Sequence, residues 1–332
     1  MQNNIFIYIL LLALLACNRI SDTGKYDDLP IELAEIRQAI DKDPHNADLY
    51  RDLSLYFIST HELDSALSAI GQAIRMDSTN DSYYETLSDV YFAQTKTDEA
   101  EEALDKALLI NHENNNARLK LAELHFLLKR YKLSQETAQQ AIMQTGHNPK
   151  AYFILAWNYR EQGDTASAIR NYLIAADQDA GYYDAYMELG ILYQYLHNAL
   201  AVDYYNNALN CRPNDFQALY NLGMYYQENK DYEKALSKYK MILQNDPNNK
   251  LALHNMGWNY LATAKYEEAA VFFSKAIEQD ETYIEAIYNR GIAFEMLQKY
   301  DNARQDFMYC LKLQPNYELA IESLNRLDKM GK

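Results

Sequence analysis

A ten-residue phrase recurs three times in the chain at an interval of 34 residues. It reads ALYNLGMYYQ from Ala218, ALHNMGWNYL from Ala252 and AIYNRGIAFE from Ala286. A small residue marks the same place in five earlier segments, and every step is 34 residues except one of 33. The eight small residues are Ser54, Ser88, Ala122, Ala156, Gly190, Gly223, Gly257 and Gly291. A constant period of this length indicates a stack of similar structural units.

Each unit contains two helical patterns. Aromatic and aliphatic residues recur four before, one before and three after the small residue, which places them on one face of an α-helix. A second set follows about twelve residues later, with a small residue such as Ala235 and a larger one such as Tyr239 four positions on. Small residues let two helix axes approach, so the unit is predicted to be a helical hairpin that crosses at these positions.

The pattern predicts an all-α fold, an α-α superhelix of eight hairpins across residues 45–317. Repeat five lacks one residue near Leu196–Leu200, which predicts a tighter internal turn. A stack needs covered ends, so residues 30–44 are predicted to form an N-terminal capping helix and residues 318–332 a C-terminal one. The predicted repeats are 47–80, 81–114, 115–148, 149–182, 183–215, 216–249, 250–283 and 284–317.

The repeated residues resemble the tetratricopeptide repeat family. The small residue, its tyrosine, the alanine of the second helix and a closing proline such as Pro247 all stand at that family's offsets. The resemblance covers most of the chain. It implies a solenoid whose first helices line a concave groove, and a non-enzymatic scaffold that binds a protein or peptide.

The resemblance also implies which side chains line that groove. Both tryptophans fall at groove offsets, and Asn221, Asn255 and Asn289 recur at the position where relatives hold an extended peptide backbone. Such an apolar and aromatic surface usually marks an interaction site. The alternatives are packing within the solenoid, self-association, and a carbohydrate or small-ligand site. The predicted groove residues are Phe153, Trp157, Met187, Ile191, Tyr195, Tyr220, Asn221, Met224, His254, Asn255, Trp258, Leu261, Tyr288, Asn289 and Ile292.

Charge narrows the expected partner. The formal net charge of −16 disfavours nucleic acid, whose phosphates an acidic chain repels. Nine acids and three bases occupy the groove offsets, which favours a partner with basic and apolar residues. No histidine pair or cysteine has a metal-ligand spacing and no phosphate-binding glycine loop is present, so neither enzyme activity, metal nor cofactor is expected. Cys211 and Cys310 are expected to be free thiols.

The N-terminus differs from the repeats. An apolar run from Ile5 to Ala16 is too short to span a bilayer and suits a secretory signal. It ends in Leu14-Leu15-Ala16-Cys17, which resembles the lipobox of bacterial lipoproteins. The resemblance implies a signal peptide at 1–16, a lipidated Cys17, a tether within 17–29, and attachment to a membrane of the bacterial envelope, more readily the outer one. The expected role is a lipid-anchored scaffold in assembly or regulation of an envelope complex.

Overall fold

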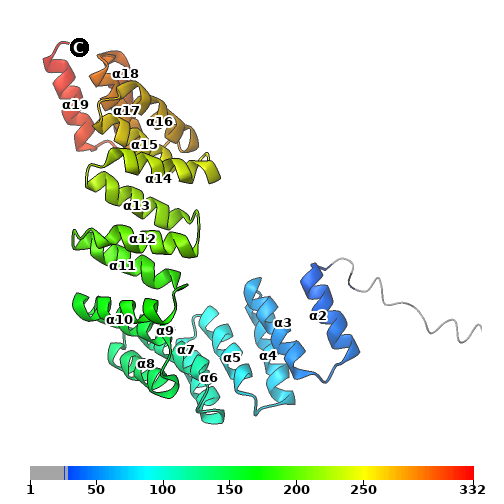
Figure 1. The fold of residues 1–332 in the computed structure, drawn as a ribbon. Helices are drawn as coiled ribbons and strands as arrows, with labels where there is room; N and C mark the ends of the chain where they lie inside the picture. The colour runs from blue at the N-terminus through cyan, green and yellow to red at the C-terminus, as the bar shows by residue number, and fades with distance from the viewer. Residues whose placement is uncertain (1–25, 27–28) are drawn as a thin grey trace, which may run out of the picture. The chain divides into compact units, whose positions relative to one another are not determined.

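The computed structural model describes residue 26 and residues 29–332 as consecutive helices joined by short turns (Figure 1). The predicted signal peptide, Cys17 and most of the predicted tether lie outside the described residues. In the described part the elements are helices α2 to α19 and no strand, which confirms the all-α fold of stacked hairpins. None of these described helices is both long and apolar enough to cross a membrane.

The helices alternate between first and second members of the hairpins. The first helices are α3 (Ala47–Ser59), α5 (Asp81–Ala93), α7 (Asn115–Leu127), α9 (Pro149–Glu161), α11 (Tyr183–Tyr195), α13 (Phe216–Glu228), α15 (Lys250–Ala262) and α17 (Ile284–Met296). The second helices are α4 (Leu63–Met76), α6 (Thr97–Ile110), α8 (Tyr131–Thr145), α10 (Thr165–Gln178), α12 (Leu200–Cys211), α14 (Tyr232–Asn245), α16 (Tyr266–Gln279) and α18 (Tyr300–Leu313). Before and after them stand α2 (Ile31–Lys42) and α19 (Glu318–Lys329).

Local chemistry sets where the first helices begin. Most of them start after an asparagine or aspartate whose side chain accepts a hydrogen bond from a backbone N–H of the first turn. Asn249, for example, accepts from the N–H of Ala252 at 3.1 Å. Such a cap satisfies a donor that the helix leaves free and contributes about 1 kcal/mol.

The turn inside every hairpin has one conformation. The residue seven positions after the small one has a left-handed φ. The backbone N–H of the residue that follows it donates to the carbonyl of the residue three positions after the small one. In repeat seven, Lys265 N–H donates to the Tyr260 carbonyl at 2.9 Å. This closure satisfies carbonyls at the end of the first helix. A glycine occupies the left-handed position in repeat four alone, so the sequence carries little signal for it. The eight residues are His61, Thr95, Lys129, Gly163, His197, Lys230, Ala264 and Gln298.

Repeat five absorbs its missing residue differently from the sequence prediction. The left-handed residue, His197, keeps its usual place, so the turn itself is not tightened. The shortening falls in the first turn of α12, where the N–H groups of Ala201 and Val202 each bond the carbonyl three residues back, at 3.2 and 3.1 Å. The equivalent Ala235 bonds the carbonyl four residues back. A 3₁₀-type start needs fewer residues per turn, so the helix takes up the deletion.

The small residue of each late hairpin leaves room for a ring on the second helix. A Cβ added to Gly257 would lie 2.8 Å from the ring of Phe273, and one added to Gly223 would lie 2.7 Å from the ring of Tyr239. These rings are fully buried. Glycine therefore allows an aromatic side chain to fill the crossing point. The pairs are Gly190 with Tyr205, Gly223 with Tyr239, Gly257 with Phe273 and Gly291 with Phe307.

The helices form two compact units, one ending at Gly146 and the other spanning His147–Lys332. The division falls within the predicted third repeat, where α8 ends in a left-handed glycine instead of the extended residue that ends α6 or α10. Within each unit first helices contact one another, α3 with α5 in the first, and α11 with α13 and α15 with α17 in the second. The side on which first helices meet is called the inner face below.

Candidate functional site

The predicted groove residues all lie on first helices of the second unit, yet few are open to solvent. Phe153, Met187 and Asn255 are buried, at 6%, 7% and 6% exposure. Ile191 and Tyr195 are exposed, at 41% and 76%. The other ten, including both tryptophans, are half-buried. The continuous aromatic surface expected from the sequence is therefore broken into a packed part and a smaller open part.

Side chains three before the small residue belong to the packed part. The Phe153 ring lies 5.3 Å from Tyr172 on its own second helix and 5.2 Å from Tyr182, which precedes the next first helix. Tyr288 likewise contacts the rings of Phe307 and Tyr317 at 5.6 and 5.7 Å. Each of these two rings contacts its own hairpin and the residue that precedes the next helix. Packing within the stack therefore occupies the surface that the sequence assigned to a partner.

The asparagines predicted to hold a peptide backbone are engaged within the protein or buried. The Asn289 amide donates to Nε2 of His254 at 3.1 Å, and Asn221 Oδ1 accepts from Gln217 at 2.8 Å. Burial lowers the pKa of His254, which keeps its imidazole neutral and Nε2 free to accept near pH 7. With Asn255 buried, the three amides do not present an open ladder.

What remains open is a hollow of about 630 Å³ on the inner face between α11 and α13. Its apolar wall is made by the two exposed groove residues, Ile191 and Tyr195. Its polar wall is made of amides, a hydroxyl and one carboxylate. The α11–α13 hollow is lined by Ile191, Gln194, Tyr195, His197, Tyr205, Gln217, Asn221 and Glu228.

The polar wall is a chain of hydrogen bonds running in one direction. Tyr205 donates to Gln194 Oε1 at 2.7 Å, and Gln194 Nε2 donates to Glu228 Oε2 at 2.9 Å. Beside this chain, Gln217 donates to Asn221 at 2.8 Å. Burial raises the pKa of Tyr205, so its hydroxyl stays protonated and able to donate. The chain ends on the carboxylate.

Tyr205 reaches this wall through its own hairpin. It stands on the second helix, its ring against Gly190, and its hydroxyl passes to the inner face. Tyr239 repeats the arrangement with Gln227 Oε1 at 3.3 Å, and Gln227 also accepts from Asn259 at 2.6 Å. Gln194 and Gln227 are not among the groove residues predicted from the sequence. Their signal was the pairing of a tyrosine on the second helix with a glutamine four after the small residue.

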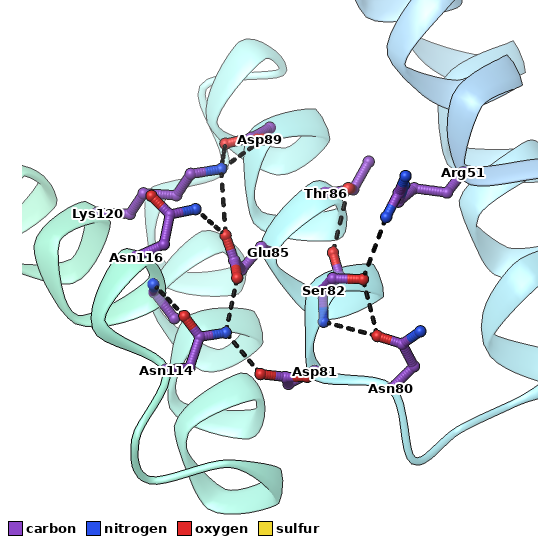
Figure 2. Close-up of polar contacts among 11 residues, drawn as sticks. Arg51, Asn80, Asp81, Ser82, Glu85, Thr86, Asp89, Asn114, Asn116 and Lys120 are labelled. Carbon is purple, nitrogen blue, oxygen red and sulfur yellow. Dashed lines mark hydrogen bonds and ion pairs between the residues drawn. The ribbon is translucent and has the colours of Figure 1, made fainter. Parts of the chain in front are cut away.

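The inner face of the first unit carries a cluster of charged and amide side chains (Figure 2). Glu85 of α5 is nearly buried, and its carboxylate accepts from Asn114 at 2.6 Å and from Asn116. Lys120 of α7 holds Asp89 at 2.7 and 2.8 Å. Figure 2 shows these side chains pointing toward one another between successive repeats. Glu85 and Asp89, two of the acids at groove offsets, are thus bound by side chains of the next hairpin, with Lys120 as their shared cation.

The described residues give little sign of catalytic or metal chemistry. No group of three histidine, cysteine or acidic side chains among them is arranged to hold a metal ion. Cys211 and Cys310 are free, as predicted. Burial raises the pKa of the Cys310 thiol to about 12, which makes it an inert packing residue.

Comparisons with known proteins identify the same type of repeat in this chain. Four models described as tetratricopeptide repeat match residues 86–149, 150–178, 215–282 and 284–317, together more than half of the chain. No curated protein sequence matches the chain.

A solved structure shows the same fold, and two others are similar to a lesser degree. The C-terminal part of a TPR repeat-containing protein from Cytophaga hutchinsonii has 23% identity and a TM-score of 0.62, over 72% of this chain and 98% of that one. A tetratricopeptide repeat protein from Parabacteroides merdae has 17% identity and a TM-score of 0.49, over 74% and 98%. Residues 41 to the end of MamA from Desulfovibrio magneticus RS-1 have 21% identity and a TM-score of 0.47, over 51% and 97%.

The repeat period, the hairpins closed at their small residues and the family matches lead to one conclusion. This chain belongs to the tetratricopeptide repeat family, and its hairpins form a scaffold of the kind that supports protein interactions.

Proposed function

We propose that the protein binds a segment of a protein partner on the inner face of its second unit, with the α11–α13 hollow as the main contact. The observation that carries the proposal is the exposure of Ile191 and Tyr195 beside converging amides, on a face whose other rings are packed. A ligand that covers them would remove apolar area from water at about 25 cal/mol per Å². The stacked helices hold the site in place, which limits the ordering needed on binding.

Site-specific photocrosslinking tests this proposal. A photoreactive amino acid at Tyr195 should form a crosslink to a partner in cells. The same probe at Val271, which is exposed on the second helix α16, should not. Equal crosslinking from both positions, or none from Tyr195, would refute the inner-face assignment. Trp157 and Trp258 are poor probes because both are half-buried, so replacing them would disturb the stack as well as the surface.

A carbohydrate ligand is the alternative for the same hollow. Sugar sites need flat exposed rings flanked by polar groups, and among the predicted groove residues Tyr195 is the one ring that is largely exposed. One ring supports a short contact better than a glycan chain. Photocrosslinks that resist proteases but not glycosidases would favour the glycan.

We further propose that Cys17 carries lipid and holds the scaffold on a bacterial envelope membrane, the outer one more readily than the inner, where it takes part in assembling or regulating an envelope complex. The support is the segment Leu14-Leu15-Ala16-Cys17 after a short apolar run. Replacing Cys17 with serine should move the protein from the membrane to the soluble fraction. An unchanged distribution would contradict the anchor.

A further inference from the structure

We infer that the α11–α13 hollow accepts a cationic side chain, arginine or lysine, from the protein partner. The inference rests on the proposed function and specifies its chemistry. Three observations support it: the direction of the hydrogen-bond chain, the balance of charge in the hollow, and the exposed ring at its edge.

The hydrogen-bond chain prepares Glu228 to accept from a ligand. Its donors point toward that residue, from Tyr205 through Gln194. Gln194 takes one lone pair of Oε2, and a carboxylate has about four acceptor positions. The bond from Gln194 fixes the carboxylate in place, and neighbouring hydrogen bonds polarise one another. Glu228 therefore presents an oriented anion with remaining acceptor capacity.

The hollow contains no lysine or arginine to neutralise this anion. Glu228 is the one acid among its eight lining residues, and His197 is the one basic side chain. Two other acids on first helices of this unit differ, because Glu188 is paired with Arg160, and Glu295 is paired with Arg326 at 2.7 Å. An anionic partner would meet Glu228 and the net charge of −16, whereas a cation would be attracted by both.

Tyr195 supplies the second element of a cation site. Its ring is 76% exposed and lines the same hollow as Glu228. The chain covers other tyrosine rings with its own cations, for example Tyr183 with Arg212 at 3.9 Å and Tyr226 with Lys234 at 5.3 Å. A carboxylate beside an open aromatic ring suits a guanidinium or ammonium group, which bonds the one and stacks on the other.

Selection from a random peptide library displayed on phage tests the inference without a known partner. The purified full-length chain is the target, and Glu228→Gln is selected in parallel. We expect the wild-type protein to enrich peptides that share an arginine or lysine at one position, and the variant to lose that preference. Enriched peptides without a shared base would overturn this inference but leave the proposed function standing. Failure to enrich any peptide would overturn both.

A double-mutant cycle then places the base in the hollow. For a selected arginine peptide, Glu228→Gln and arginine-to-citrulline replacement should each weaken binding about three- to tenfold, and together no more than either alone. Glu233→Gln, which changes an exposed acid on α14, is the matched control and should have no effect. Tyr195→Phe should retain binding, while Tyr195→Ala should weaken it. Additive losses in the cycle would show that the base binds elsewhere and contradict the inference.

Discussion

At the scale of single residues, the presence or absence of a Cβ atom on the small residue decides which side chain can fill the crossing point of a hairpin. A glycine in the first helix lets a ring of the second helix lie against its backbone, as Phe273 does against Gly257. The first three repeats use serine or alanine there, with the smaller Ile70, Leu104 and Ala138 opposite. Ala156 with Tyr172 is an intermediate combination in repeat four. In repeats five to eight a glycine is thus matched by an aromatic ring, whereas the earlier repeats pair serine or alanine with side chains of various sizes.

Gly257→Ala should destabilise the second unit by about 1–3 kcal/mol, because its Cβ would lie 2.8 Å from two carbons of the Phe273 ring. Adding Phe273→Leu should recover part of the loss. Gly71→Ala is the control, since its Cβ would meet only the end of the Arg75 side chain at 3.4 Å. That change should be neutral or stabilising by about 0.5–1 kcal/mol. Chemical denaturation measures both, and equal effects would contradict the packing argument.

His254 should make stability depend on pH. Burial lowers its pKa in the folded protein below the unfolded value near 6.5. The neutral imidazole contributes its full share to the free energy of unfolding above about pH 6.5. That contribution is lost as pH falls toward the lowered pKa of the folded state. His254→Gln should remove this part of the acid sensitivity, whereas His112→Gln, at an exposed site, should not. Unfolding measured from pH 7.5 to 5 checks this, and identical slopes for wild type and His254→Gln would disprove it.

At the scale of helices, side chains that cross a hairpin tie successive repeats together. The Tyr239 hydroxyl donates to Gln227 across its hairpin. Gln227 also accepts from Asn259, which links α13 to α15. The next repeat has Phe273 and Leu261 at the matching positions, so it lacks both the ring hydroxyl and the amide that would accept its hydrogen bond. In these two hairpins the residue on the second helix and the one on the inner face match, as expected where a buried polar group needs a partner.

Exchanging the ring type between these two hairpins should be unfavourable in both directions. Tyr239→Phe should cost about 0.5–1.5 kcal/mol by removing the hydroxyl from Gln227. Phe273→Tyr should cost about 1–3 kcal/mol, because its hydroxyl would be buried opposite Leu261. Adding Leu261→Gln should restore part of the second loss. If Leu261→Gln gives no recovery in denaturation, the two positions are not coupled as described.

At the scale of the whole molecule, helices contact mainly the partner helix of their own hairpin and the helices of the neighbouring repeats, so damage should stay local. Helix α19 covers the last hairpin with the buried Ala320, Ser323 and Leu327, and Arg326 bonds Glu295 at 2.7 Å. Its removal would expose Phe307 and Ile287, which are fully buried. The inner face carries a cluster of charged and amide side chains in the first unit, and packed rings beside an open hollow with a polar wall in the second.

Deleting residues 317–332 should therefore loosen α17 and α18 and leave α9 to α12 protected. Hydrogen exchange read by mass spectrometry resolves the two regions. Arg326→Gln removes the ion pair but keeps the helix, and because Arg326 is half-exposed it should cost under about 1 kcal/mol. A uniform loss of protection across the second unit would contradict local stacking.

The sequence alone determined the repeat, the hairpins and the two short end helices, because small and apolar residues recur with the period of the units they build. The resemblance to the repeat family also implied where the inner face lies, through the offsets that were carried over from it. Only the tertiary structure decided which inner-face side chains are free. Phe153 and Tyr195 are both aromatic residues at predicted groove offsets, yet Phe153 is buried against Tyr172 and Tyr182 while Tyr195 is 76% exposed. Exposure depends on what neighbouring repeats bring to each position, and one helix's periodicity does not contain that information.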